Sequence, residues 1–139
     1  MLWTTKLLVI ANRTVASDEL VSALRARAAA GPIEVTLVAP ADTDRAQVAD
    51  RLERAVERLE YEGIHVAEGL VGHRDPLVAV QEVWDPRRFD EVIVVTLPTD
   101  VSRWMTLDLP HRIERFTGAR MTHVVASSAV ARRRPRAHV

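Results

Sequence analysis

The stretch Glu91–Leu97 reads EVIVVTL, and Lys6–Ala11 reads KLLVIA. Both are nearly continuous aliphatic runs rather than alternations of apolar and polar residues. A strand with that pattern is buried on both faces, as in a parallel sheet with helices on each side. The two runs therefore predict the central strands of a parallel α/β sheet.

Further strands and helices are predicted on either side of these runs. The additional strands are Ile33–Ala39, His65–Val71 and Met121–Ala126. The helices are Ser17–Ala30, Asp42–Glu62, a helix opened by Asp75-Pro76 and closed by Asp85-Pro86, and Asp108–Phe116. Right-handed crossovers then make the order βαβαβαβαβ a doubly wound sheet in a single domain, residues 1–127. Residues 128–139 are predicted to be a disordered basic tail.

Helical spacing predicts which side chains face inward and which pair on the surface. Leu20, Ala23, Leu24 and Ala28 are expected on one face of the first helix. The last helix has Ile113 and Phe116 as its expected apolar pair. Asp50 and Arg54 have the i,i+4 spacing of an ion pair.

Composition and charge exclude several classes of protein. Net charge is zero over 139 residues, but four arginines lie in the last nine residues. The remainder holds 15 basic against 19 acidic residues, a net of −4, so we do not expect nucleic-acid binding. The chain has no cysteine, which excludes a disulfide scaffold and a thiol nucleophile. No catalytic motif or metal-ligand spacing is present, so neither a catalytic residue nor a metal site is expected.

The sequence shows neither a signal-peptide core nor a membrane-spanning segment. The apolar run Leu7–Ala11 is too short for a signal core, and no window has the roughly 20 apolar residues of a membrane span. We therefore expect a cytoplasmic protein without a membrane partner.

Ligands of doubly wound sheets bind outside the carboxyl ends of the strands. The loops expected there are Asn12–Ala16, Pro40–Thr43, Gly72–Pro76 and Pro98–Asp108. The last loop is the longest and carries Trp104, either as a lid or dimer anchor or as a platform for a stacked base.

Over residues 5–127 the chain resembles the universal stress protein family, which has an adenine nucleotide alpha hydrolase-like fold. The resemblance rests on the element order and on Gly72-His-Arg-Asp75-Pro76, which is similar to the family's glycine-x-proline loop. It implies the strand order 3-2-1-4-5 and a homodimer formed through the fifth strand, Met121–Ala126.

The family's nucleotide-binding residues are replaced in this chain. Its motif Gly-x2-Gly-x9-Gly-Ser/Thr aligns with Thr96, Thr99 and Leu109-Pro110. Asn12-Arg13-Thr14 stands in place of Asp-x-Ser/Thr, and Pro40 stands where a backbone N–H would meet adenine. Glycine allows the close backbone approach that a phosphate needs, and proline has no N–H to donate. We therefore do not expect ATP as a cofactor.

Polar side chains instead predict a site for an anionic small molecule. Arginine forks bind carboxylates and phosphates through paired hydrogen bonds, and Arg74 could join those of the flanking loops. The predicted ligand-binding residues are Asn12, Arg13, Thr14, Pro40, Thr96, Thr99, Ser102, Arg103, Asp108, His111 and Arg112. The alternative is a purely structural loop, in which Asp108 caps the last helix and Arg112 pairs with it. His111 would then be solvated surface, and Asn12 a turn residue.

Three functions remain open. The first is a non-enzymatic regulatory or stress-response protein that binds an anionic small molecule or a protein partner as a homodimer. The second is an ATP- or AMP-binding universal stress protein with slow hydrolysis. The third is a dimerisation scaffold that uses only its edge strand and the Trp104 loop. A receiver domain is excluded, because Ala11-Asn12 and Gly72-His73 stand where its acidic residues are required.

Overall fold

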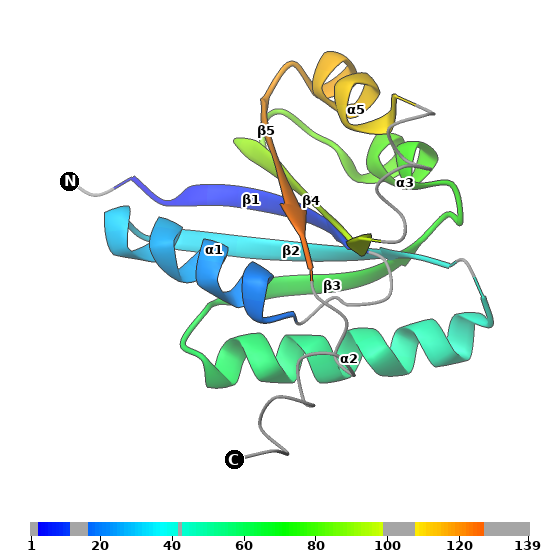
Figure 1. Cartoon of the computed structure of the whole chain (residues 1–139). Helices are drawn as coiled ribbons and strands as arrows, with labels where there is room; N and C mark the ends of the chain where they lie inside the picture. Colours follow the sequence, from blue (N-terminus) through cyan, green and yellow to red (C-terminus); the bar gives the residue numbers. More distant parts are fainter. Residues whose placement is uncertain (1–2, 12–16, 42, 99–107, 127–139) are drawn as a thin grey trace.

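The protein folds around a five-stranded, all-parallel sheet (Figure 1). The computed structural model describes residues 3–11, 17–41, 43–98 and 108–126. The strands lie in the order β3-β2-β1-β4-β5, which confirms the predicted doubly wound sheet and its strand order. They are β1 (Thr5–Ala11), β2 (Ile33–Pro40), β3 (Val66–Gly72), β4 (Glu91–Thr96) and β5 (Arg120–Val125).

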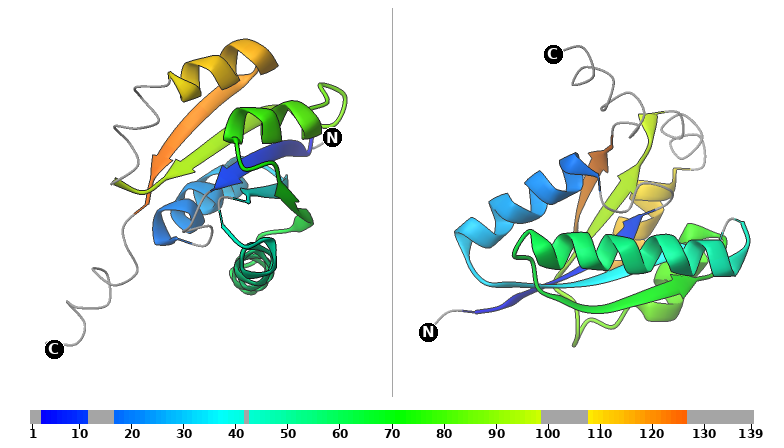
Figure 2. Two further views of the ribbon diagram at one scale, coloured as in Figure 1. Left: turned by 90° about the vertical axis from the view of Figure 1, so that its right-hand side faces the viewer. Right: turned by 90° about the horizontal axis from the view of Figure 1, so that it is seen from below.

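Two pairs of helices cover the two faces of the sheet (Figures 1 and 2). Helices α1 (Asp18–Ala30) and α2 (Arg45–Tyr61) pack on one face, and α3 (Pro76–Val83) and α5 (Leu109–Thr117) on the other. β1 and β4 contribute alternate residues to both cores. Leu7, Val9 and Ile93 face α1 and α2, whereas Leu8 and Val94 face α3 and α5. The continuous apolar runs are therefore central strands, as their pattern predicts.

Side-chain caps explain where three of the helices begin. The Ser17 hydroxyl accepts a hydrogen bond from the Leu20 N–H at 3.2 Å, so α1 starts at Asp18. Asp75 accepts from the Leu77 N–H at 2.9 Å and precedes Pro76, as predicted for the start of α3. Asp44 caps α2 through the Ala46 N–H at 2.7 Å, so that helix begins three residues later than predicted. Such caps satisfy N–H groups that have no partner inside the helix.

The predicted helix faces are partly wrong. In α1, Val21 is buried beside Leu20 and Leu24, whereas Ala28 is exposed. In α5, Ile113 is fully buried, but Phe116 is 47% exposed and does not belong to the core. The predicted i,i+4 pair on α2 is confirmed, with Arg54 and Asp50 3.6 Å apart. The α5 error matters for function, because it leaves an aromatic ring on the surface.

A paired ionic contact ties α1 to the amino end of β4. The Arg27 guanidinium donates two hydrogen bonds of 2.6 Å to the Glu91 carboxylate. This bidentate geometry is the stronger form of an ion pair. These hydrogen bonds lower the pKa of Glu91, against the opposing effect of burial.

In the part of the chain that the structure describes, no helix is both long and apolar enough to span a membrane.

Candidate functional site

The carboxyl ends of β1 and β4 define the point where a doubly wound sheet binds its ligands. β1 pairs with β2 on one side and β4 on the other, so the crossovers depart in opposite directions between β1 and β4. A crevice at such a switch point is the usual ligand site of this architecture. Seven residues predicted for the site or its lid lie outside the described residues: Asn12, Arg13, Thr14, Thr99, Ser102, Arg103 and Trp104.

Pro40 lies in the sheet at the carboxyl end of β2. It is buried and aligned with Gly72 of β3. The next residue, Ala41, donates its N–H to the Gly72 carbonyl at 3.1 Å, which extends the pairing beyond the strand. Proline has no N–H, so position 40 offers a ligand no backbone donor.

Thr96 ends β4 and its side chain is held by the edge strand. Its hydroxyl lies 2.7 Å from Nε2 of His123 on β5, and the residue is 1% exposed. Its carbonyl accepts the Ala126 N–H at 2.7 Å. Thr96 therefore ties the carboxyl ends of β4 and β5 together. A ligand at the switch point would have to share a hydroxyl that is already engaged.

His123 was not among the predicted site residues. It is aligned with Val94 and therefore points to the α3 and α5 face of the sheet. Burial lowers its pKa, so the neutral imidazole is the favoured form. The period-two alternation of β5, with Met121 and His123 on one face, was the signal that could have placed it beside the end of β4.

The His123 environment predicts a pH dependence of stability. The unfolded chain has the ordinary histidine pKa of about 6.5, and the folded pKa is lower. The unfolded state therefore binds more protons in that window, and the stability from neutral His123 is lost as pH falls below about 6.5. We expect the urea midpoint of the parent protein to drop between pH 7.5 and 5.5. His123→Gln should show a smaller drop, because glutamine does not titrate, and the glutamine amide can still contact the Thr96 hydroxyl. An equal drop in both proteins would exclude His123 as its source.

Asp108 begins α5 in an unusual conformation. Its φ is 53° and its ψ is 34°, and no other described non-glycine residue has a positive φ. Its carboxylate makes no capping hydrogen bond to the helix and instead lies 3.4 Å from Nδ1 of His111. The side-chain cap considered from the sequence is therefore wrong. The left-handed backbone turns the carboxylate away from the first-turn N–H groups, and aspartate tolerates that conformation better than most residues.

Arg112 does not form the pair with Asp108 that the alternative of a purely structural loop requires. Its backbone N–H donates to the Asp108 carbonyl at 2.9 Å, but within the described residues its guanidinium has no carboxylate partner. The same holds for Arg115 one turn away. Two cations thus lie on the exposed side of α5 without a neutralising acid among the residues described.

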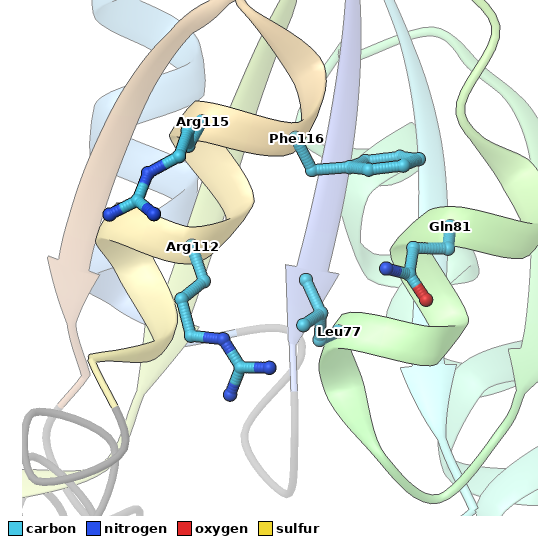
Figure 3. A pocket seen from close by; sticks show the side chains of 5 residues that line it. All are labelled: Leu77, Gln81, Arg112, Arg115 and Phe116. Atoms are coloured by element: carbon cyan, nitrogen blue, oxygen red, sulfur yellow. The ribbon is translucent and has the colours of Figure 1, made fainter.

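These cations border a shallow groove between α3 and α5 (Figure 3). Its volume is about 250 Å³, and its lining is Leu77 and Gln81 from α3 with Arg112, Arg115 and Phe116 from α5. Figure 3 shows Arg112 and Phe116 projecting from α5 toward α3, where Leu77 and Gln81 face them. The groove is therefore lined by two apolar side chains, two cationic side chains and one neutral amide.

The structure brings together only part of the predicted site. Asp108, His111 and Arg112 cluster at the start of α5, and Thr96 ends the neighbouring strand. Arg74 is exposed in the turn before α3 and does not line the groove with Arg112. Sequence reasoning missed Arg115, Gln81 and the exposure of Phe116. The i,i+4 spacing of Arg112 with Phe116 and of Leu77 with Gln81 was the available signal, because such residues share one face of a helix.

Comparison with known proteins adds no family. Neither the scan against protein-family models nor the search of curated proteins gave a match to this chain. In the described part of the chain, no three His, Asp or Glu side chains are grouped as metal ligands would be. The fold and the groove therefore define the molecule as a doubly wound α/β protein with a surface groove bordered by two arginines.

Proposed function

We propose that this chain is a universal stress protein-like regulatory protein that binds a small anionic molecule and does not bind ATP in the family's usual way. The observation that carries the proposal is the cationic surface of α5, where the guanidiniums of Arg112 and Arg115 have no carboxylate partner among the described residues. Unpaired guanidiniums are ready donors for carboxylate or phosphate. The proposal places the protein in the cytoplasm, in keeping with a sequence that has no cysteine.

Two features at the switch point argue against the nucleotide-binding alternative. Thr96 is buried and its hydroxyl is engaged by His123, at a position where a glycine nest would require open backbone. Pro110 is buried in the first turn of α5 and supplies no N–H there. A phosphate chain would lose one of the N–H donors that a helix N-terminus normally offers it.

The same proposal includes a homodimer formed through β5. Among the described strands, β5 lies at the edge of the sheet and pairs with β4 alone, and Val125 on it is 43% exposed. An unpaired edge offers N–H and C=O groups to a second strand. Light scattering would then give twice the 15.5 kDa chain mass. A dimer that binds no ligand would instead favour the scaffold alternative.

A ligand panel tests the proposed function. We expect citrate, inorganic phosphate or another multivalent anion to raise the thermal midpoint of the whole chain. ATP and AMP should raise the midpoint no more than a simple anion of the same charge does. Binding that stabilises only the folded state shifts the midpoint as ligand concentration rises. Arg112→Gln with Arg115→Gln should abolish the shift. Arg54→Gln with Arg87→Gln removes two exposed arginines outside the groove and should retain the shift, which controls for net charge. Tight binding of ATP would establish the nucleotide-binding alternative.

A further inference from the structure

The groove between α3 and α5 combines two kinds of wall that suit one kind of ligand. Phe116 is 47% exposed, and Leu77 beside α5 is only partly buried, so both offer apolar surface. The exposed Phe116 is unusual, since the other large apolar residues of α5 are in the core. Covering an exposed aromatic ring with an apolar group removes apolar surface from water and lowers the free energy of the complex.

The charged group and the aromatic ring lie at opposite ends of the groove. Arg112 and Phe116 occupy one face of α5, a turn apart, so the guanidinium lies at one end of the groove and the ring at the other (Figure 3). Gln81 faces the ring end from α3 and supplies an amide that donates or accepts. Arg115 also borders the groove, although its guanidinium extends away from α3 in this view.

We infer that this groove binds a small organic carboxylate with an apolar, preferably aromatic, body. The carboxylate pairs with the Arg112 guanidinium, and the apolar body covers the Phe116 ring and Leu77. The inference rests on the proposed function and deepens it, because it assigns the anion's chemical class and places the anion between α3 and α5.

Size and charge support this choice of ligand. A volume of about 250 Å³ is below that of pockets for drug-sized molecules, so the ligand has roughly ten non-hydrogen atoms. An inorganic anion would leave the Phe116 ring uncovered, and an uncharged hydrocarbon would leave the Arg112 fork unused. A carboxylate matches the planar fork of arginine with two parallel hydrogen bonds.

The test is a titration of the ¹⁵N-labelled full chain with 3-phenylpropionate, followed by NMR. We expect saturable shifts of the amides of residues 77–81 and 112–116, with a dissociation constant on the order of 1 mM. The uncharged analogue 3-phenylpropanamide should bind at least about tenfold more weakly, because it has no charge for Arg112. Inorganic phosphate should also bind at least about tenfold more weakly, because it has no apolar body.

Variants separate the two walls of the groove. Arg112→Gln should weaken 3-phenylpropionate binding about tenfold, and Phe116→Ala about fivefold. Arg87→Gln removes an exposed arginine outside the groove and should bind as the parent does. Because Phe116 is half exposed, Phe116→Ala should keep the parent spectrum elsewhere, and Phe116→Leu should recover part of the affinity.

Three results would overturn the inference. The first is equal binding of the acid and its amide, the second is unchanged affinity in both Arg112→Gln and Phe116→Ala, and the third is no saturable shift at about 10 mM, well above the expected dissociation constant. If panel anions still stabilise the chain in any of these cases, the proposed function stands and only this site is wrong. If no anion of either kind binds, the proposed function fails as well.

Discussion

Ile113→Ala is expected to lower the free energy of unfolding by about 3 kcal/mol, the usual cost of truncating a fully buried aliphatic side chain. Ile113 is 0% exposed and is one of three buried residues that seat the nine-residue α5 on the sheet. Removing its side chain leaves a cavity beneath the helix that carries Arg112 and Phe116. Urea unfolding followed by circular dichroism measures the loss.

Phe116→Ala provides the matched control on the same helix. Its side chain is 47% exposed, so we expect a loss of less than about 1 kcal/mol. If the two substitutions cost the same, the assignment of Ile113 to the inner face and Phe116 to the surface is wrong. The α3–α5 groove would then lose its apolar wall.

Gly72→Ala is expected to cost about 2 kcal/mol, because a Cβ at this position has no room. It would lie 2.9 Å from Cβ of Ala79 and 3.0 Å from Cγ1 of Val38. Neither neighbour is a flexible side chain, so α3 must move away from the sheet. Thermal or urea unfolding of the variant measures the cost.

A double-mutant cycle with Ala79→Gly tests the cause of that cost. Removing the Ala79 methyl group should recover part of the loss, beyond the sum of the two single changes. Gly31→Ala is the control, since a Cβ there meets nothing within 4 Å, and we expect a change of about 0.5 kcal/mol or less. Additive effects of Gly72→Ala and Ala79→Gly would show that the helix does not press on this glycine.

Both substitutions bear on the proposed site through the seating of the two helices. Gly72 lets α3 approach the sheet, and Ile113 anchors α5 beside it. Leu77 and Gln81 lie on the first of these helices, and Arg112 and Phe116 on the second. A shift of either helix should therefore widen the groove and weaken 3-phenylpropionate binding, even though neither substituted residue lines it.

The strands were predictable from local pattern because burial on both faces leaves a direct mark on the residues. Every predicted strand agrees with the structure to within one residue at each end, including Glu91–Leu97 against β4 at Glu91–Thr96. The parallel topology followed from the alternation of strands and helices. The order 3-2-1-4-5 came from the family resemblance instead, since the crossover rule allows more than one order.

The candidate site was less predictable, because it depends on helix rotation and on one backbone angle. Phe116 follows Ile113 by three residues, which suggests a shared inner face, yet only Ile113 reaches the core. An aspartate just before a helix, as at position 108, is typical of a side-chain cap, but the left-handed conformation of Asp108 directs its carboxylate to His111. The Asp108 conformation has no local signature, whereas the i,i+4 spacing of Arg112 with Phe116 was the one signal for the rotation of α5.

The residues alone establish a parallel α/β chain without cysteine, with central strands Lys6–Ala11 and Glu91–Leu97. These properties follow from the composition and from short-range periodicity. Tertiary packing decides that Thr96 is held by His123, that Arg112 has no acidic partner among the described residues, and that α3 and α5 leave a groove between them. Such contacts join residues far apart in the chain, so they depend on how whole helices and strands are seated.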